Sequence, residues 1–132
     1  MYDKAKVEYH REQVSSFIVA HHVVSAVESE DGEIFTGFCI ESASGVMNLC
    51  AERVAALNMY MSTGKMRIRR LIACRENPPK NGGMPCGACR EFLMQLDRAN
   101  GEMEILTDFE SRRTVKLKHV FPSWWGEKRY VE

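Results

Sequence analysis

The chain has 132 residues, a length typical of one domain that is large enough to bury a hydrophobic core. Its 18 lysines and arginines balance 18 aspartates and glutamates, so the formal net charge is zero. Polynucleotide-binding proteins usually carry a basic excess, and this composition therefore argues against a nucleic-acid partner. We expect a single domain over residues 1–132.

The sequence also argues against a membrane protein. No apolar run approaches the roughly 20 residues that a membrane-spanning helix needs, and the charged N-terminal stretch lacks the apolar centre of a signal peptide. We expect a cytoplasmic protein. A reducing compartment and an odd count of five cysteines disfavour a disulfide framework. Cys39 and Cys74 lie in apolar, strand-like runs, and we interpret both as small buried hydrophobic residues.

The first part of the chain predicts a helix followed by a β-hairpin. Residues 3–16 are polar with scattered apolar positions, which suggests a helix of low amphipathicity. Residues 17–27 are rich in β-branched side chains, and Asp31-Gly32 separates them from the apolar run at residues 34–40. An Asp-Gly pair between two apolar runs is a typical hairpin signal, so we predict two antiparallel strands.

The middle of the chain predicts helices and strands in alternation. Over residues 50–62 apolar positions recur at intervals of four, three and four residues, which indicates a helix that Gly64 ends. Ile68–Cys74 is a short apolar run and a third strand. Residues 77–84 hold two prolines and two glycines and form a loop. Another helix runs over about residues 86–98.

The end of the chain predicts two more strands, over residues 104–109 and 114–117. Only about four residues connect them, whereas parallel neighbours need a crossover of a dozen or more, so the two strands should pair antiparallel. The order of the elements predicts an α/β fold, as a three-layer α/β/α sandwich with a five-stranded mixed sheet.

Three cysteines lie where two of the predicted helices begin. Cys50 starts the first of these helices, and Cys86 and Cys89 start the second. A catalytic zinc takes three protein ligands and leaves a fourth position for water, and three thiolates supply such a set. The partial positive charge of two helix N-termini favours the ionised thiolates. We predict that these cysteines bind Zn²⁺.

Two arginines follow the cysteine motifs directly. Three thiolates around one zinc ion leave a net negative charge, which makes a bound water less acidic. Arg53 and Arg90 are placed to offset this charge, and we expect at least one of them to donate a hydrogen bond to a ligand sulfur. The alternative for each is an arginine solvated at the surface.

Glu52 is the candidate catalytic residue. It lies two residues after Cys50, about 200 degrees around an ideal helix, so the two side chains serve one site only if metal and substrate lie beyond the helix start. In that arrangement Glu52 is placed to take a proton from a water at the metal and to deliver protons to a bound substrate.

The cysteine pattern has other meanings when its parts are taken alone. Cys86-Gly87-Ala88-Cys89 is compatible with a thioredoxin-like redox pair, or with half of a structural zinc site completed by Cys50 and Cys74. The preceding Pro85 and the Cys-Ala-Glu string together match the signature of zinc deaminases, in which a Cys or His, one residue and a Glu are followed by Pro-Cys-x-x-Cys. We therefore favour a deaminase.

The chain resembles the cytidine deaminase family over nearly its whole length. Residues 41–53 are similar to the family's substrate loop and first metal motif, residues 85–90 to its second, and residues 31–37 to its first hairpin. Antiparallel last strands are the arrangement of the branch that acts on free nucleosides. The resemblance implies a zinc-dependent hydrolase that converts cytidine or deoxycytidine to the uridine product. It also implies a homo-oligomer, a tetramer or a dimer, with active sites completed by neighbouring subunits.

The resemblance implies substrate contacts from Cys39, Glu41, Ala51 and Trp125. Family members that act on ribosides usually carry an Asn, a variable residue, a Glu and another Asn in the strand after the hairpin, and the first Asn and the Glu bind the sugar hydroxyl. Glu41 is kept here, but Cys39 replaces the Asn, and a thiol is a poor substitute for an amide. Trp125, three residues after Pro122, matches the aromatic residue that stacks on the base. The alternative for both C-terminal tryptophans is packing between subunits.

Two other functions stay open at this point. Blasticidin-type antibiotic deaminases share the metal motifs but lack the strand Glu, so Glu41 and the longer loop before Cys50 favour the nucleoside branch. The C-terminal run at residues 121–125 leaves the antibiotic branch open. The second alternative is a zinc-stabilised oligomer with little turnover, which the replacement of Asn by Cys39 motivates.

Overall fold

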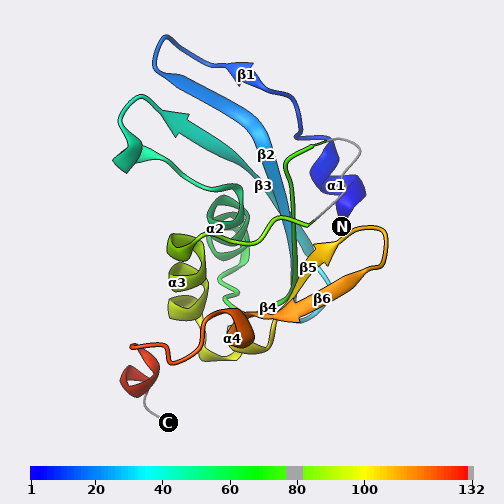
Figure 1. Ribbon diagram of the computed structural model, residues 1–132, viewed down its shortest axis with the longest axis vertical. Helices are drawn as coiled ribbons and strands as arrows, with labels where there is room; N and C mark the ends of the chain where they lie inside the picture. The colour runs from blue at the N-terminus through cyan, green and yellow to red at the C-terminus, as the bar shows by residue number, and fades with distance from the viewer. Residues whose placement is uncertain (77–81, 131–132) are drawn as a thin grey trace.

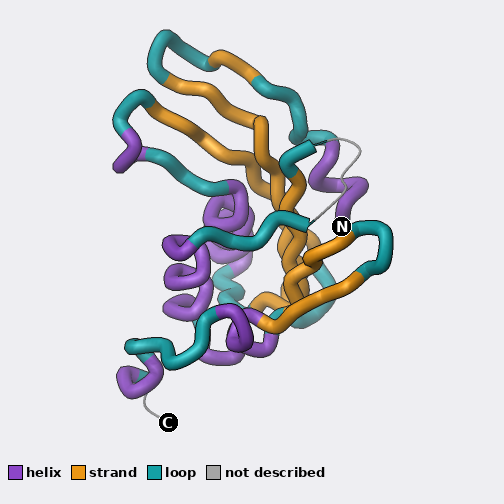
Figure 2. Tube along the Cα trace, viewed as in Figure 1, coloured by secondary structure: helices purple, strands orange, loops and turns teal. Residues whose placement is uncertain are grey.

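The computed structural model describes residues 1–76 and 82–130, so part of the predicted loop at residues 77–84 lies outside the described residues. A mixed β-sheet runs through the centre, with helices on both of its faces (Figures 1 and 2). The strands are β1 (Glu12–Gln13), β2 (Ile18–Ser29), β3 (Ile34–Ser42), β4 (Ile68–Cys74), β5 (Glu104–Asp108) and β6 (Arg113–Lys116). The helices are α1 (Tyr2–Lys6), α2 (Ala51–Thr63), α3 (Gly87–Leu96) and α4 (Leu117–Val120), with short 3-10 turns η1 (Gly45–Met47), η2 (Arg98–Glu102) and η3 (Glu127–Arg129). The predicted α/β fold with a mixed sheet is confirmed.

Strand β2 organises the sheet. It pairs antiparallel with β3 along one edge and with β4 along the other. Strands β4 and β5 pair in parallel, since α3 lies in the connection between them. Strands β5 and β6 pair antiparallel across a four-residue link, as the sequence predicted. The two-residue β1 adds a sixth strand, which the sequence did not predict.

The predicted first hairpin is confirmed, but the predicted extent of the first helix is wrong. Strands β2 and β3 turn at Asp31-Gly32, where Gly32 adopts a φ of +90°, a conformation that glycine reaches without steric cost. The helix predicted for residues 3–16 ends at Lys6. Between Lys6 and Phe17 the apolar residues are Val7, Tyr9 and Val14, too few for the buried face of a helix, and the backbone of Glu12 and Gln13 pairs with β2 instead.

Side chains of the central strands alternate between two cores. In β4, Leu71 packs against α2 and α3, and Ile72 packs on the α1 side. In β5, Ile105 packs in the same core as Leu71, and Leu106 packs in the same core as Ile72. Among the described residues, no helix is long and apolar enough to cross a membrane.

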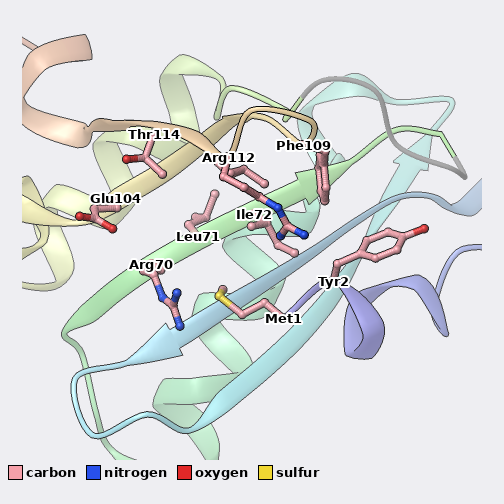
Figure 3. Close-up of a pocket in the computed structure, with 10 residues that line it drawn as sticks. Met1, Tyr2, Arg70, Leu71, Ile72, Glu104, Phe109, Arg112 and Thr114 are labelled. Carbon is pink, nitrogen blue, oxygen red and sulfur yellow. The ribbon is translucent and has the colours of Figure 1, made fainter.

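The five-residue helix α1 covers only part of its face of the sheet. The rest of that face carries a groove of about 500 Å³, which is lined by Ile72 and Phe109 together with Arg70 and Arg112 (Figure 3). The cysteine motifs contribute nothing to its lining, because they lie at the starts of α2 and α3 on the other face. The predicted chemistry therefore belongs elsewhere in the fold.

Helix α2 lies directly on β3 because small residues line the contact. A Cβ atom on Gly37 would lie 2.3 Å from the backbone nitrogen of Ala55 and 2.7 Å from the carbonyl oxygen of Ala51. Ala51, Ala55 and Ala56 are themselves fully buried. This close approach fixes where α2 begins, and the beginning of α2 carries Cys50 and Glu52.

A buried carboxylate on β2 is neutralised from β4. Glu28 is 6% exposed and lies opposite Arg70 in the strand register. Arg70 donates from Nε to Glu28 Oε1 at 3.1 Å and from Nη2 to Oε2. These hydrogen bonds from Arg70 hold the pKa of Glu28 below its ordinary value of 4.5, although burial works in the opposite direction.

Replacing Arg70 by alanine should lower the free energy of unfolding near neutral pH by about 1–3 kcal/mol, because the buried Glu28 carboxylate loses its main donor. The pKa of Glu28 is lowered in the folded state. The stabilisation by Arg70 is therefore fully present above about pH 4.5 and is lost as the pH falls through the pKa that Glu28 has in the folded protein. Urea unfolding of both proteins at a series of pH values measures the difference, which should shrink under acid. Arg69→Ala, at a residue exposed by 62%, is the control and should cost less. A difference that does not change with pH would contradict this account of Glu28.

Candidate active site

The two helix starts that carry the cysteines meet in the structure. Cys50 is the N-cap of α2, Cys86 is the N-cap of α3, and Cys89 lies in the first turn of α3. The three sulfur atoms lie within 4.8 Å of one another, and the Sγ atoms of Cys50 and Cys86 are 3.5 Å apart. The structure therefore brings the predicted cysteine triad together.

The spacing and exposure of the triad fit a zinc ion. Two Zn–S bonds of about 2.3 Å at a tetrahedral angle place their sulfurs about 3.8 Å apart, close to the separation of Cys50 and Cys86. Cys89 is buried, Cys50 is half-buried and Cys86 is exposed. One side of the triad thus opens towards solvent, which is the arrangement of a catalytic rather than a closed structural site.

Cys74 does not join the triad. It lies in the core on the α1 side of the sheet with Val24 and Ala5, and burial raises the pKa of its thiol to about 11. The cysteine cluster of the described residues consists of Cys50, Cys86 and Cys89 without it. The alternative of a four-cysteine structural zinc site therefore has no support from the geometry.

The two thiols of α3 differ in acidity. Burial raises the pKa of Cys89, and the charges of Glu52, Cys50 and Cys86 raise it further. Burial also acts on Cys86, but the backbone N–H of Cys89 and the neighbouring thiols outweigh it and lower the pKa of Cys86. The helix start therefore favours a thiolate at Cys86, as expected for a cap residue with free N–H groups nearby.

Arg53 lies beside the triad, as the sequence predicted for at least one arginine. Its Nη2 is 3.6 Å from Cys50 Sγ and 3.4 Å from the carbonyl oxygen of Asn48. Burial disfavours the charge, yet the Cys50 and Cys89 side chains raise the pKa of Arg53 above its ordinary value. Its buried Nε has no hydrogen-bond partner among the described residues.

Arg90 has a different task. It donates from Nε to the carbonyl oxygen of Pro85 and from Nη1 to that of Val120, both at 2.9 Å. These bonds tie the segment before Cys86 to helix α4. The described hydrogen bonds of Arg90 thus help to position Cys86, and none of them reaches a sulfur atom.

Glu52 is buried next to the triad. It is the second residue of α2 and only 4% exposed. Burial raises the pKa of Glu52, although its own backbone N–H and the charges of Arg75 and Arg53 act in the opposite direction. A carboxyl group with a raised pKa is suited both to accept and to donate a proton near neutral pH.

A pocket of about 200 Å³ joins these groups. Besides Cys50, Cys86 and Glu52, it is lined by the predicted substrate residues Cys39, Glu41 and Ala51, and also by His22, Val23, Ile40, Asn48, Leu49 and Arg75. Its volume lies below the roughly 300–1,000 Å³ that is typical of small-molecule sites.

His22 is the functional residue that sequence reasoning missed. Its Nε2 lies 3.0 Å from Glu41 Oε2, and its Nδ1 lies 3.3 Å from Cys39 Sγ. Cys39 also accepts a hydrogen bond of 3.3 Å from the backbone N–H of Val23. No local motif marks this histidine. The hairpin register was the one available signal for this contact. Counted back from Asp31-Gly32, it brings position 39 opposite position 23, directly next to His22.

Trp125 does not reach this pocket within the chain. Glu91 on the outer side of α3 accepts hydrogen bonds from the indole N–H groups of both Trp124 and Trp125, at 2.7 and 2.6 Å. Trp125 is 62% exposed and lines a different pocket, together with Tyr130. Trp125 therefore does not line the pocket of Cys50 and Glu52, and its stacking on the base stays a prediction.

No family model matches the chain. The cytidine deaminase of Mycobacterium tuberculosis is 35% identical over 106 residues, which span 79% of this chain and 72% of that protein. The blasticidin-S deaminase of Bacillus cereus is 31% identical over 81 residues, which span 55% of this chain and 56% of that protein. The crystal structure of a Glu-to-Asp variant of the M. tuberculosis cytidine deaminase has a TM-score of 0.73 at 25% identity, covering 96% of this chain and 90% of its own.

Fold and site together define an α/β protein with a three-cysteine centre at two helix starts and a buried glutamate beside it. The identity and coverage of its relatives show that the chain belongs to the cytidine deaminase family. The resemblance seen in the motifs is thereby confirmed.

Arg53→Ala should weaken zinc binding by about 10- to 100-fold, because the substitution removes the cation beside the cysteine sulfurs. Competition with a chromophoric zinc chelator measures the affinity. Arg53→Lys keeps the charge without the planar guanidinium and should retain part of the affinity. Zinc binding by Arg53→Ala as tight as that of the unchanged protein would show that Arg53 does not support the triad.

Proposed function

We propose that the chain is a zinc-dependent hydrolytic deaminase that converts cytidine or deoxycytidine to the uridine product with release of ammonia. The observation that supports this proposal most is the cysteine triad beside buried Glu52, in a chain of the cytidine deaminase family. Cys50, Cys86 and Cys89 would hold the ion, which when bound acts as a Lewis acid and lowers the pKa of water in its open position.

Glu52 moves the protons of the reaction. Its carboxylate takes one proton from water as the water oxygen bonds to C4 of the cytosine ring, and passes that proton to ring nitrogen N3. Glu52 then carries the remaining hydroxyl proton to the amino group, which leaves as ammonia while the C4 carbonyl forms. Burial supports both steps, because a desolvated carboxyl group binds and releases protons closer to neutral pH.

Cys39, His22 and Glu41 form the sugar end of the pocket. Glu41 supplies the acceptor for a sugar hydroxyl, and its carboxylate is held by His22 Nε2 at 3.0 Å. The thiol of Cys39 is a weak donor and acceptor, whereas the imidazole of His22 is a strong one. We infer that His22 orients Glu41 for the sugar hydroxyl and so offsets the loss of the Asn that riboside-specific members have at position 39. This supports the nucleoside branch over the antibiotic branch.

A homo-oligomer, a tetramer or a dimer, would complete the site. Large apolar side chains are exposed in the turn η1 before α2 and on α2 itself, among them Val46, Met47 and Met61. A second copy packed on this surface would bury them and enclose the small pocket. Trp125, exposed and outside the pocket of its own chain, is then available to stack on a base bound by a neighbour. We also propose a cytoplasmic role in pyrimidine salvage.

Purified zinc-loaded protein should deaminate cytidine or deoxycytidine, which an ultraviolet assay follows as loss of the cytosine chromophore. Glu52→Gln should keep the zinc but lose at least about 100-fold in kcat, because the amide cannot carry protons. Blasticidin S tests the antibiotic alternative in the same assay. If the protein turns over none of the three compounds, a zinc-stabilised oligomer with little turnover describes it better. Retained turnover in Glu52→Gln would contradict the role of Glu52.

His22→Ala should raise the KM for cytidine by about tenfold or more, since Glu41 loses the group that orients it. Free cytosine has no sugar, so any turnover of cytosine should be unaffected. Cys39→Asn restores an amide beside His22 and should raise kcat/KM for cytidine. Equal losses for cytidine and cytosine in His22→Ala would contradict a role at the sugar.

A further inference from the structure

Two histidines and a glutamate gather where the segment after α1 meets β2, apart from the cysteine triad. His10 and Glu12 come from that segment, and His21 comes from β2. Their nitrogen and oxygen atoms lie within 4.8 Å of one another. Nε2 of His10 and Nε2 of His21 lie 3.9 and 3.8 Å from the same oxygen, Oε2 of Glu12. Three donor atoms therefore converge on one point.

The inner histidine is held with its free nitrogen facing that point. The His21 side chain is only 12% exposed, and its Nδ1 lies 2.8 Å from the carbonyl oxygen of Glu8. A carbonyl oxygen only accepts, so Nδ1 carries a proton and, in the neutral ring, Nε2 keeps its lone pair. Histidines that bind metals almost always donate their other ring N–H in this way.

A stack of three rings aligns the two imidazoles. The ring of His10 lies on that of His21 at 4.0 Å and 22°, and His21 lies on Phe38 at 3.7 Å and 19°. The backbone of His21 has a φ of +65° within the irregular stretch of β2 between Ala20 and Val24. His21 thereby faces His10, while the next residue, His22, lines the active-site pocket.

The chemistry of the three donors selects the class of ion. Two imidazoles and one carboxylate suit zinc and neighbouring first-row divalent metals, whereas calcium and magnesium prefer oxygen ligands throughout. Metal bonds of about 2.0–2.2 Å place neighbouring donors about 3.3 Å apart, so the observed 3.8–3.9 Å needs a small closure. The side chains of His10 and Glu12 are more than half exposed and free to make it.

We propose that His10, Glu12 and His21 form a second divalent-metal site of the zinc class, distinct from the cysteine triad. The remaining coordination positions open to water, because two of the three ligands are exposed. A metal there ties the segment after α1 to β2. The site uses no residue of the proposed deaminase mechanism.

Metal content after equilibrium dialysis against buffered zinc tests the proposal. The unchanged protein should hold two zinc ions per chain, and His10→Ala and Glu12→Gln should each hold one, or bind the second at least about tenfold more weakly. Both changed residues are exposed, so the fold should persist, which circular dichroism checks. His119→Ala, an exposed histidine on α4, is the matched control and should keep two ions.

Cobalt distinguishes the two sites in the same protein. Co²⁺ added to protein that holds one zinc ion per chain should give visible d–d absorption without the sulfur-to-cobalt charge-transfer band of a thiolate site, and Glu12→Gln should lose the d–d absorption. One metal per chain in all variants, or a charge-transfer band from the added cobalt, would overturn the proposal. Cytidine turnover by zinc-loaded His10→Ala should be unchanged, so failure of this site and failure of the deaminase proposal are separable.

Discussion

The close packing of α2 on β3 is the constraint on which the candidate active site depends. Gly37 and the buried alanines of α2 let the two backbones meet, and α3 packs on the same face of the sheet. Two helices that share a face and start at the same level bring their N-termini together. That meeting point gathers Cys50, Cys86 and Cys89, and it buries Glu52 at their side.

Charge is balanced locally at this meeting point. Thiolates and a buried carboxyl group concentrate negative charge, and helix N-termini and Arg53 act against it, as a divalent ion bound to the triad would. Glu52 in α2 keeps a raised pKa because its desolvation outweighs the nearby arginines, whereas Glu28 in β2 has a lowered pKa because Arg70 binds it directly. Two buried glutamates thus differ in acidity through a single contact, and the difference suits one to proton transfer and the other to stability.

The sequence predicted the parts of the site that depend on local order. A cysteine at a helix start and a glutamate two residues later are visible in a few residues, and the triad formed as expected. His22 was missed because only the register of β2 and β3 brings it to Cys39 and Glu41. The stacking role of Trp125 stays a prediction, and the hydrogen bond that holds its ring to Glu91 on α3 could not be read from its spacing to a proline. Long-range contacts of this kind leave no periodic trace in the chain.

The most direct test of the account is zinc X-ray absorption on His10→Ala protein loaded with one zinc ion per chain, a variant that removes the second proposed site. The account predicts three sulfur ligands at about 2.3 Å and one oxygen ligand at about 2.0 Å, as expected for a catalytic ion with an open position. Four sulfur ligands would indicate a closed structural site. That result would contradict the proposal that the cysteine triad and Glu52 act on water.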